Sequence, residues 1–409
     1  MSSDNDTARP APWLTVIGLG EDGVAGLSPI ARQALADARR VFGGARHGEL
    51  VAPLGIKVET WPSPFHEGLD ALLAARGKPV AVLASGDPMW FGIGSTLARS
   101  VPHDEMLVLP APSSLSLAAA RLGWPLQDVE TLSLHGRPLD LLRAVLYPGA
   151  RLLCLTSGAR AAEEIADLLV DEGYGASRLT VLEHLGGPAE RVLSGSAEGW
   201  RGEVAALNVV AVEAVAVRDT PLRPRLPGLP DDAFRHDGKI TKREVRAVTL
   251  ARLAPMPGAL LWDIGAGSGA VAIEWLRAAP RSRAIALEPD DTRRATARAN
   301  AAALGVPHLD LRPDAAPQGL DGLPAPDAIF LGGGLTAPGT LEAALAALRS
   351  GGRLVANAVT LESEAILLAA HARHGGELVR IAVSRAGAVG GMTGWRPLMP
   401  VTQWSLIVP

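Results

Sequence analysis

A short apolar run passes directly into a glycine-rich turn in the sequence LLWDIGAGSG, which covers residues 260–269. Residues 271–278, which follow, carry apolar side chains at helical spacing. Glycines let a backbone turn sharply into a helix and approach a ligand closely, as in dinucleotide-binding loops. Asp263 stands inside this motif, and an acidic residue there favours a ligand with a cationic end over one with a phosphate end. The stretch predicts a strand, a ligand-binding turn and a helix of an α/β fold.

Three further elements follow this turn in the order that such a ligand site requires. A strand candidate at residues 283–287 ends at Glu288, and a carboxylate at that position can accept both hydroxyls of a ribose. Asp314 follows the run 309–312, and three glycines follow the run 327–331. The set resembles the Rossmann-like class I S-adenosylmethionine-dependent methyltransferases. The resemblance implies S-adenosylmethionine as the ligand, with contacts from Asp263, Gly265, Gly267, Gly269, Glu288, Asp314 and Ala315.

The segment that enters this half of the chain reads GLPDDAFRHDGKITKREVRA over residues 228–247. Thr241 is predicted to cap a helix that begins at Lys242, with Glu244 as its capping-box partner. The order of aspartate, phenylalanine, histidine-aspartate-glycine and threonine-lysine resembles the decarboxylating precorrin methyltransferases called CbiT. The glycines 332–334 and the sequence ANAVTLE at 356–362 resemble the same family, so the likeness runs from about residue 226 to the C-terminus.

Four cations of this segment are candidates for holding substrate carboxylates. Guanidinium groups match carboxylates bidentately, and ammonium groups act as compact point charges. The alternative is that these cations form only the solvated basic face of a capped helix. The candidate residues for the reaction in this half are Lys239, Lys242, Arg243 and Arg246.

The first half of the chain carries a second set of motifs. They are VIGLGEDG at 16–23, LASGDPMWFGIG at 83–94, PAPSS at 110–114, LTSG at 155–158, EHLG at 183–186 and LNVV at 207–210. This set resembles the tetrapyrrole methylase superfamily, the class III methyltransferases with two α/β subdomains, and within it the CbiE branch. The resemblance covers residues 13–217 and implies a cofactor cleft lined by Gly18, Gly20, Gly86, Asp87 and Ser114. For Asp87 the alternative is a carboxylate that only caps its own loop.

The length of 409 residues exceeds what one hydrophobic core usually serves, so more than one domain is expected. Prolines recur at every third position from Pro221 to Pro230, which favours an extended connector. We predict a tetrapyrrole-methylase domain at 1–219, a linker at 220–230 and a class I methyltransferase domain at 231–409. The α/β assignment also rests on strand candidates at 14–17, 80–83, 152–155 and 207–212, alternating with helix candidates at 28–40, 69–75, 161–172, 244–253, 291–304 and 340–348.

Composition excludes several other classes of protein. A net charge of −4 gives no overall reason to bind nucleic acid or an anionic membrane, and the apolar stretch 258–276 contains two carboxylates that would be costly in lipid. A polar N-terminus and a single cysteine, Cys154, predict a cytoplasmic protein without disulfides. Cys154 is expected to be a small buried hydrophobe. Among the histidines, His371 and His374 are the one pair at metal-ligand spacing, but they lack an acidic partner and are expected to form a solvated face, so no metal is predicted. Trp90, beside Gly-Asp-Pro, is the tryptophan best placed to stack on a flat ligand.

Both halves therefore resemble methyltransferases of cobalamin biosynthesis. The resemblance implies one S-adenosylmethionine per domain and precorrin-6Y as substrate. It implies methylation of C5 in the first half, and methylation of C15 with decarboxylation of the C12 acetate in the second, to give precorrin-8. It also implies a homo-oligomer. Two alternatives stay open at this point: a tandem methyltransferase acting on RNA or protein, and a non-catalytic sensor of S-adenosylmethionine.

Overall fold

The computed structural model describes residues 12–156 and 158–409, so the predictions for the N-terminal segment and Ser157 lie outside the described residues. The chain divides into two compact units. Unit 1 extends to Arg137 and continues from Pro148 to Thr220, and unit 2 combines Pro138–Tyr147 with Pro221–Pro409.

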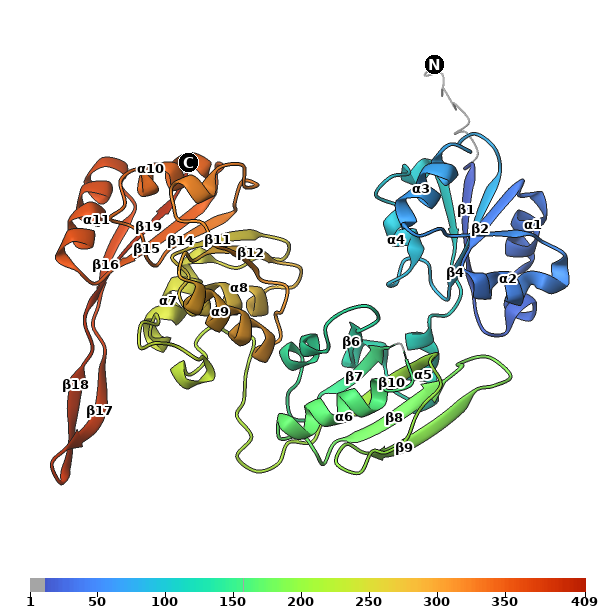
Figure 1. Ribbon diagram of the computed structural model, residues 1–409, viewed down its shortest axis with the longest axis horizontal. Helices are drawn as coiled ribbons and strands as arrows, with labels where there is room; N and C mark the ends of the chain where they lie inside the picture. Colours follow the sequence, from blue (N-terminus) through green and yellow to red (C-terminus); the bar gives the residue numbers. More distant parts are fainter. Residues whose placement is uncertain (1–11, 157) are drawn as a thin grey trace, which may run out of the picture. The chain divides into compact units, whose positions relative to one another are not determined.

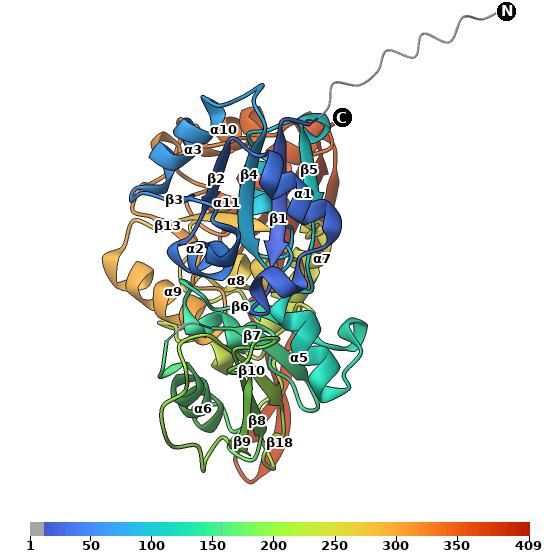
Figure 2. The ribbon, with the colours of Figure 1, turned by 90° about the vertical axis from the view of Figure 1, so that its right-hand side faces the viewer.

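The first of the two sheets in unit 1 has five strands in the order β3-β2-β4-β1-β5. Its neighbouring strands are all parallel, and Figure 2 shows β2, β4, β1 and β5 side by side. Alternate residues of β1 and β4 enter two different core clusters, because helices cover both faces of the sheet. The elements are β1 (Leu14–Leu19), α1 (Pro29–Asp37), β2 (Arg40–Gly43), α2 (Ala45–Val51), β3 (Val58–Thr60), α3 (Phe65–Leu73), β4 (Val80–Ser85), α4 (Ile93–Leu97) and β5 (Met106–Leu109).

The second sheet of unit 1 contains parallel and antiparallel strands in the order β6-β7-β10-β8-β9. Strand β10 is antiparallel to both of its neighbours, β7 and β8. The elements are α5 (Ser114–Leu122), β6 (Glu130–Ser133), β7 (Arg151–Leu155), α6 (Ala161–Asp171), β8 (Arg178–Glu183), β9 (Arg191–Ser196) and β10 (Asn208–Glu213).

Unit 2 is built on a seven-stranded sheet in the order β13-β12-β11-β14-β15-β19-β16. The first five strands are parallel, and β19 is antiparallel to β15 and β16. The elements are α7 (Arg243–Leu253), β11 (Leu260–Ile264), α8 (Ala270–Ala278), β12 (Arg283–Leu287), α9 (Asp291–Ala303), β13 (Asp310–Arg312), β14 (Ala328–Leu331), α10 (Thr340–Ala347), β15 (Arg353–Ala358), α11 (Leu361–His374), β16 (Glu377–Ile381) and β19 (Val401–Ile407).

Two smaller features complete unit 2. Strands β17 (Ser384–Val389) and β18 (Met392–Pro397) form a separate two-stranded ribbon, which Figure 1 shows extending away from the sheet. The 3-10 helix Leu139–Ala144 packs on α9 although its neighbours in sequence belong to unit 1. Gly305 allows this close approach, because a Cβ there would lie 2.3 Å from the Ala144 nitrogen.

The α/β fold class predicted from the sequence is confirmed, and each strand and helix candidate named above coincides with an observed element to within a few residues. Within the described ranges, every helix falls short of the length and apolar character that a bilayer crossing requires. The parallel arrangement places the ends of β11, β12 and β14 at one edge of the unit 2 sheet, which is where ligands bind in such sheets.

Candidate active sites

A cavity of about 890 Å³ opens at this edge of the unit 2 sheet. Its walls come from the turns after β11, β12 and β14, from residues 238–242 and from residues near the start of β19. We call residues 228–242 the entry strap, because this segment precedes α7 and its end forms one wall. The predicted residues that line the cavity are Lys239, Lys242, Gly265, Gly267, Glu288, Asp314 and Ala315.

The glycine turn of unit 2 is shaped by close backbone contact. Gly265 has a φ of +74°, and a Cβ on it would lie 2.6 Å from the Cα of Gly333. The turns after β11 and β14 therefore touch at a point where any side chain would separate them. This contact creates a cradle whose floor is backbone.

Asp263 and Gly269, predicted as cofactor contacts, are not among the described residues that line this cavity. Asp263 is 1% exposed, and its Oδ2 accepts a hydrogen bond from the Ala272 amide in the first turn of α8. Burial raises the pKa of Asp263 to about 7. Gly269 is the N-cap of α8 with a φ of +76°. Both residues join the glycine turn to its helix instead of facing the cavity.

Glu288 stands at the end of β12 and lines the cavity, as expected. Its Oε2 accepts the Gly267 amide at 2.8 Å, and its Oε1 accepts the Asp290 amide at 3.1 Å. Each oxygen keeps further acceptor capacity, which suits a ligand with a vicinal diol. The carboxylate thus holds the glycine turn while presenting acceptors to a ligand.

The structure corrects the prediction for Arg246. Its side chain is fully buried, and its guanidinium contacts Glu274 at 2.7 Å, Asp231 at 3.2 Å and the carbonyl oxygens of Thr241 and Leu229. It also lies over the Phe234 ring, 4.8 Å from the centroid. A guanidinium with this set of partners cannot reach a substrate. Arg246 instead fastens the entry strap to α7 and α8.

Two more predictions about this segment are corrected. Helix α7 begins at Arg243, and its N-cap is Lys242 without a side-chain capping bond among the described residues. The Asp231 carboxylate accepts the Arg243 amide at 2.9 Å, so it takes the place predicted for Thr241. Arg243 is not among the described residues that line the cavity.

Three cations of unit 2 do line the cavity: Lys239, Lys242 and Arg293. The Arg293 guanidinium pairs with Asp237 at 2.8 Å, whereas Lys242 Nζ donates to the Gly238 carbonyl at 3.4 Å. Two of these cations thus place positive charge along the entry strap, and the third adds positive charge from α9.

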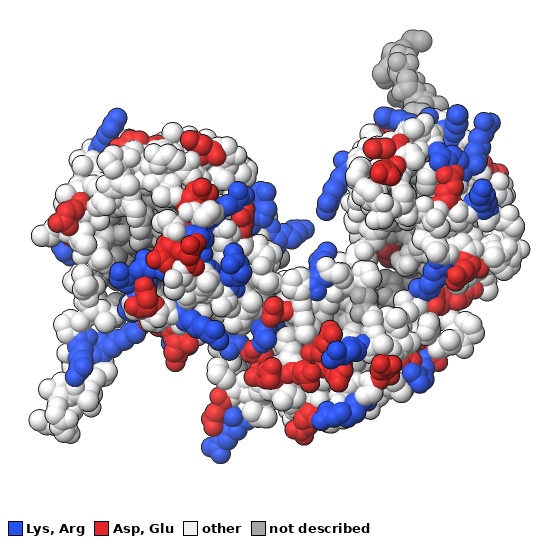
Figure 3. Space-filling view, viewed as in Figure 1, with Lys and Arg blue, Asp and Glu red and all other residues white. Residues whose placement is uncertain are grey.

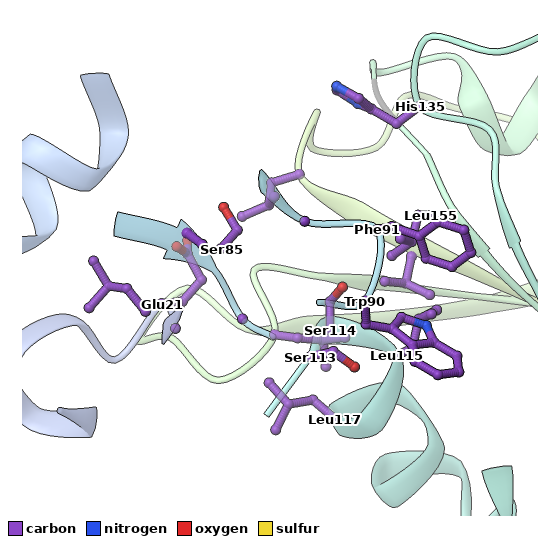
Figure 4. A pocket seen from close by; sticks show the side chains of 18 of the residues that line it. Glu21, Ser85, Trp90, Phe91, Ser113, Ser114, Leu115, Leu117, His135 and Leu155 are labelled. Carbon is purple, nitrogen blue, oxygen red and sulfur yellow. The ribbon is translucent and has the colours of Figure 1, made fainter. Parts of the chain in front are cut away.

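Unit 1 holds a cavity of about 460 Å³ at the ends of β1, β4, β7 and β10. Of the predicted contacts, Gly20, Gly86 and Ser114 line it. Figure 4 shows Glu21 at one side of the cavity and the Trp90 and Phe91 rings at the other, with Ser113 and Ser114 between them. Trp90 is half exposed, and its ring meets that of Phe91 edge-on at 6.1 Å, so two aromatic rings at right angles give the cavity an apolar wall.

Gly18 and Asp87, both predicted to line the cofactor cleft, are not among the described residues that line this cavity. A Cβ on Gly18 would lie 2.1 Å from the Gly86 carbonyl oxygen, so Gly18 allows two loops to touch beneath the cavity. Asp87 accepts the Met89 amide at 2.8 Å and is absent from the described lining. The loop-cap alternative for Asp87 therefore fits the structure better than cofactor contact.

Comparison with known proteins identifies both regions. Residues 14–199 match the family described as tetrapyrrole (corrin/porphyrin) methylases, and residues 232–408 match a precorrin methyltransferase domain. A protein of Sinorhizobium named precorrin-6Y C(5,15)-methyltransferase [decarboxylating] is 55% identical over 98% of this chain and 98% of its own length. The chain belongs to the precorrin-6Y C(5,15)-methyltransferase family.

Other members of this methyltransferase family align over most of the chain or over one unit. A Mycobacterium tuberculosis protein of the same name is 45% identical over 96% of this chain and 99% of its own length. The crystal structure of the C-terminal domain from Rhodobacter capsulatus is 46% identical, and the match covers 45% of this chain and 98% of that domain with a TM-score of 0.43.

Several residues that shape or line the cavities of this family member were not found by sequence reasoning. Asn300, buried on α9, accepts the Arg235 amide at 2.8 Å and donates to the Ser268 carbonyl at 2.9 Å, which ties the entry strap to the glycine turn. In unit 1, His47 and His184 line the cavity. A polar residue at one position of a helix or turn carries no sequence signal for a partner many residues away.

Cys154 is buried in β7, and burial raises the pKa of its thiol to about 12. This confirms the expectation of a small buried hydrophobe. Among the described residues, no cluster of three or more His, Cys, Asp or Glu side chains has the geometry to hold a metal ion.

Proposed function

We propose that the protein is a decarboxylating precorrin-6Y C5,15-methyltransferase of cobalamin biosynthesis that takes both methyl groups from S-adenosylmethionine. The observation that carries this proposal is the 55% identity over 98% of both chains to a protein of that name. No structural observation favours an RNA or protein substrate or a purely sensory role. The product would be precorrin-8, with carbon dioxide released from the C12 acetate.

We assign C15 methylation and decarboxylation to unit 2 and C5 methylation to unit 1. The family matches support this division, since residues 232–408 match a precorrin methyltransferase domain and residues 14–199 match tetrapyrrole methylases. Each unit has its own cavity, which supports one S-adenosylmethionine per unit. We retain the boundaries 1–219, 220–230 and 231–409 as proposed domain limits.

In unit 2, the residues present fit S-adenosylmethionine, because a backbone cradle and the Glu288 acceptors meet at one edge of the sheet. When bound, it supplies an electrophilic methyl group. Glu288 would hold the ribose, and the glycine turn would hold the remainder of the ligand against the cavity floor. Fixing this geometry relative to a nucleophilic meso carbon provides most of the acceleration that such a transfer needs.

Lys239, Lys242 and Arg293 would bind the peripheral carboxylates of the macrocycle. Decarboxylation leaves an electron pair that the conjugated macrocycle can accept, so the protein needs no covalent intermediate. The apolar wall of the cavity, which includes Phe330 and Val359, would desolvate the departing carboxylate.

In unit 1, the residues present also fit S-adenosylmethionine. Gly86 has a φ of +59°, and a Cβ on it would lie 2.9 Å from the Ser113 Cα, so backbone lines this cavity as well. Ser113 caps α5, and its helix N-terminus faces the same space. Trp90 and Phe91 would pack against the face of the macrocycle.

The test is mass spectrometry of metal-free precorrin-6Y after incubation with the protein and labelled S-adenosylmethionine. We expect a product with two labelled methyl groups that has lost carbon dioxide. A substrate returned unmodified, with methyl transfer to RNA or protein instead, would overturn the proposal.

A double variant tests the role of the entry-strap lysines. Lys239→Ala with Lys242→Ala should raise the KM for precorrin-6Y about tenfold and leave cofactor affinity within twofold, because these cations are assigned to substrate. High salt should likewise raise the KM of the wild-type protein for precorrin-6Y, since partly exposed ion pairs are screened. Lys78→Ala, on the exposed surface of unit 1, is the matched control. An equal loss of cofactor affinity would mean that the lysines stabilise the entry strap and do not bind substrate.

We further propose a cytoplasmic homo-oligomer that binds neither nucleic acid nor membrane. The single cysteine and the biosynthetic relatives support the compartment. Acidic and basic side chains are interspersed over both units on the face drawn in Figure 3, which gives a polyanion no continuous basic track there. Light scattering measures the oligomeric state.

A further inference from the structure

The unit 1 cavity contains a carboxylate–histidine pair whose two residues follow strands of different sheets. Glu21 follows β1, and His184 follows β8; both line the cavity. Glu21 Oε2 lies 3.4 Å from His184 Nδ1. The other carboxylate oxygen of Glu21 pairs with Arg46, which also lines the cavity. The carboxylate is therefore held from both sides, and one of its oxygens faces the imidazole.

This arrangement favours the imidazole tautomer that carries its proton on Nδ1, toward the carboxylate. When Nδ1–H donates to a carboxylate, the lone pair of a neutral histidine lies on Nε2. Among the described residues, none is hydrogen-bonded to Nε2 of His184, and its side chain is 35% exposed within the cavity lining. Nε2 is thus available to accept a proton from a ligand.

The backbone of His184 supports a functional role independently. Its φ is +47°, a left-handed conformation that non-glycine residues rarely adopt. Five described non-glycine residues have positive φ, and two of them, Phe91 and His184, line this one cavity. Such conformations concentrate at functional sites, where the surrounding structure maintains them. Here the conformation turns the chain at the end of β8.

The other histidines of the cavity are less suited to accept a proton. His47 Nδ1 accepts the Gly44 amide at 3.0 Å, so its proton lies on Nε2, which donates to Ser85. Its accepting nitrogen is occupied by the backbone. His135 lies apart from Glu21 and Trp90 in Figure 4, and no described carboxylate orients it.

The proposed C5 methylation requires a proton acceptor. C5 bonds to the methyl carbon as the bond between that carbon and sulfur breaks, which leaves C5 carrying both a methyl group and its original hydrogen. Breaking the C5–H bond returns its electron pair to the macrocycle and restores conjugation. The proton must pass to a base in the cavity.

We infer that His184, oriented by Glu21, is the general base that removes this proton at Nε2 during C5 methylation in unit 1. The inference rests on the proposed function, because it names a residue role for that reaction. His184 is the catalytic residue, since it contacts the reacting C5–H, and Glu21 is a positioning residue that acts through it. Solvent at the exposed side of the imidazole receives the proton afterwards.

The test uses His184→Asn in the full chain, with the C15-methylated, decarboxylated intermediate as substrate. General bases contribute about 10²–10⁴-fold, so kcat for C5 methylation should fall by about that factor while KM and cofactor affinity change less than threefold. Glu21→Gln should lower kcat by a smaller factor, again with KM unchanged. His103→Asn, an exposed histidine outside the described cavity lining, is the matched control.

Two readouts separate a base from a structural residue. His184→Gly keeps the positive φ without strain, so added imidazole should restore part of its activity. Deuterium at C5 should slow His184→Asn more than wild type, because proton removal becomes rate-limiting. Unchanged kcat, loss of cofactor affinity, or absence of rescue would overturn the role of His184. A wild-type protein that methylates C15 but never C5 would overturn the unit 1 assignment together with this inference.

Discussion

Close backbone contacts shape both cavities, Gly265 against Gly333 in unit 2 and Gly18 against Gly86 in unit 1, but the charged pairs around the two cavities differ. In unit 2, the entry strap is held by a fully buried guanidinium, Arg246, between Glu274 and Asp231, and by the buried amide of Asn300. In unit 1, the charged pair in the cavity wall, Glu21 with Arg46, is partly exposed. Removing one partner of a buried ion pair lowers the folding stability far more than removing one partner of a partly exposed pair. Single substitutions should therefore damage unit 2 more than unit 1.

The largest expected effect is that of Arg246→Met. It leaves Glu274 buried without its partner, and breaking a buried pair in this way costs about 3–5 kcal/mol. Hydrogen–deuterium exchange should show lost protection in α7 and α8 while β4 of unit 1 keeps its protection. Arg380→Ala, which removes an exposed pair with Glu364, should change stability by less than about 1 kcal/mol. Equal effects of the two variants would contradict the comparison.

Glu288→Ala should weaken cofactor binding in unit 2 and spare unit 1. Two charge-assisted hydrogen bonds to a ribose would be lost, each worth roughly 1.5–3 kcal/mol. Isothermal titration calorimetry should find one of two sites weakened. Glu342→Ala, in the exposed first turn of α10, controls for loss of charge. Two unchanged sites in Glu288→Ala would refute the assignment.

His47 makes unit 1 sensitive to acid. Burial, reinforced by the Arg46 charge, lowers the pKa of His47 from 6.5 to about 4. Between these pH values the unfolded chain binds more protons than the folded one, so stability is full above pH 6.5 and falls by roughly 1–3 kcal/mol as the pH drops to 4. Unfolding of His47→Gln should depend less on pH across this window, and His66→Gln, exposed on α3, should behave as wild type.

The smallest effect is expected for Asp87→Ala. Because the Met89 amide is the one donor to its carboxylate among the described residues, the loss should be about 0.5–1 kcal/mol of loop stability, with C5 methylation slowed less than threefold. Single-turnover mass spectrometry measures the rate. A hundredfold loss would restore Asp87 to the cofactor site and make unit 1 as sensitive as unit 2.

The sequence was sufficient for what local pattern determines. The strand, turn and helix around Asp263, the carboxylate after β12 and the alternation of strands and helices were all predicted, because each depends on neighbouring residues. Arg246 was misassigned because its burial depends on Glu274, 28 residues away. Thr241 does not cap α7, because the carboxylate of Asp231, twelve positions before Arg243, accepts the Arg243 amide instead. The approach of Glu21 to His184, 163 residues apart, is set by the packing of two sheets and leaves no mark in either local motif.

The buried thiol of Cys154 has a practical consequence for spectroscopy. It is the chain's one cysteine, and burial raises its pKa to about 12, so maleimide reagents should leave it unlabelled in the folded protein. A cysteine introduced on the exposed surface of each unit would then carry a fluorophore without background. Energy transfer between two such labels would report whether the separation of the units changes during turnover.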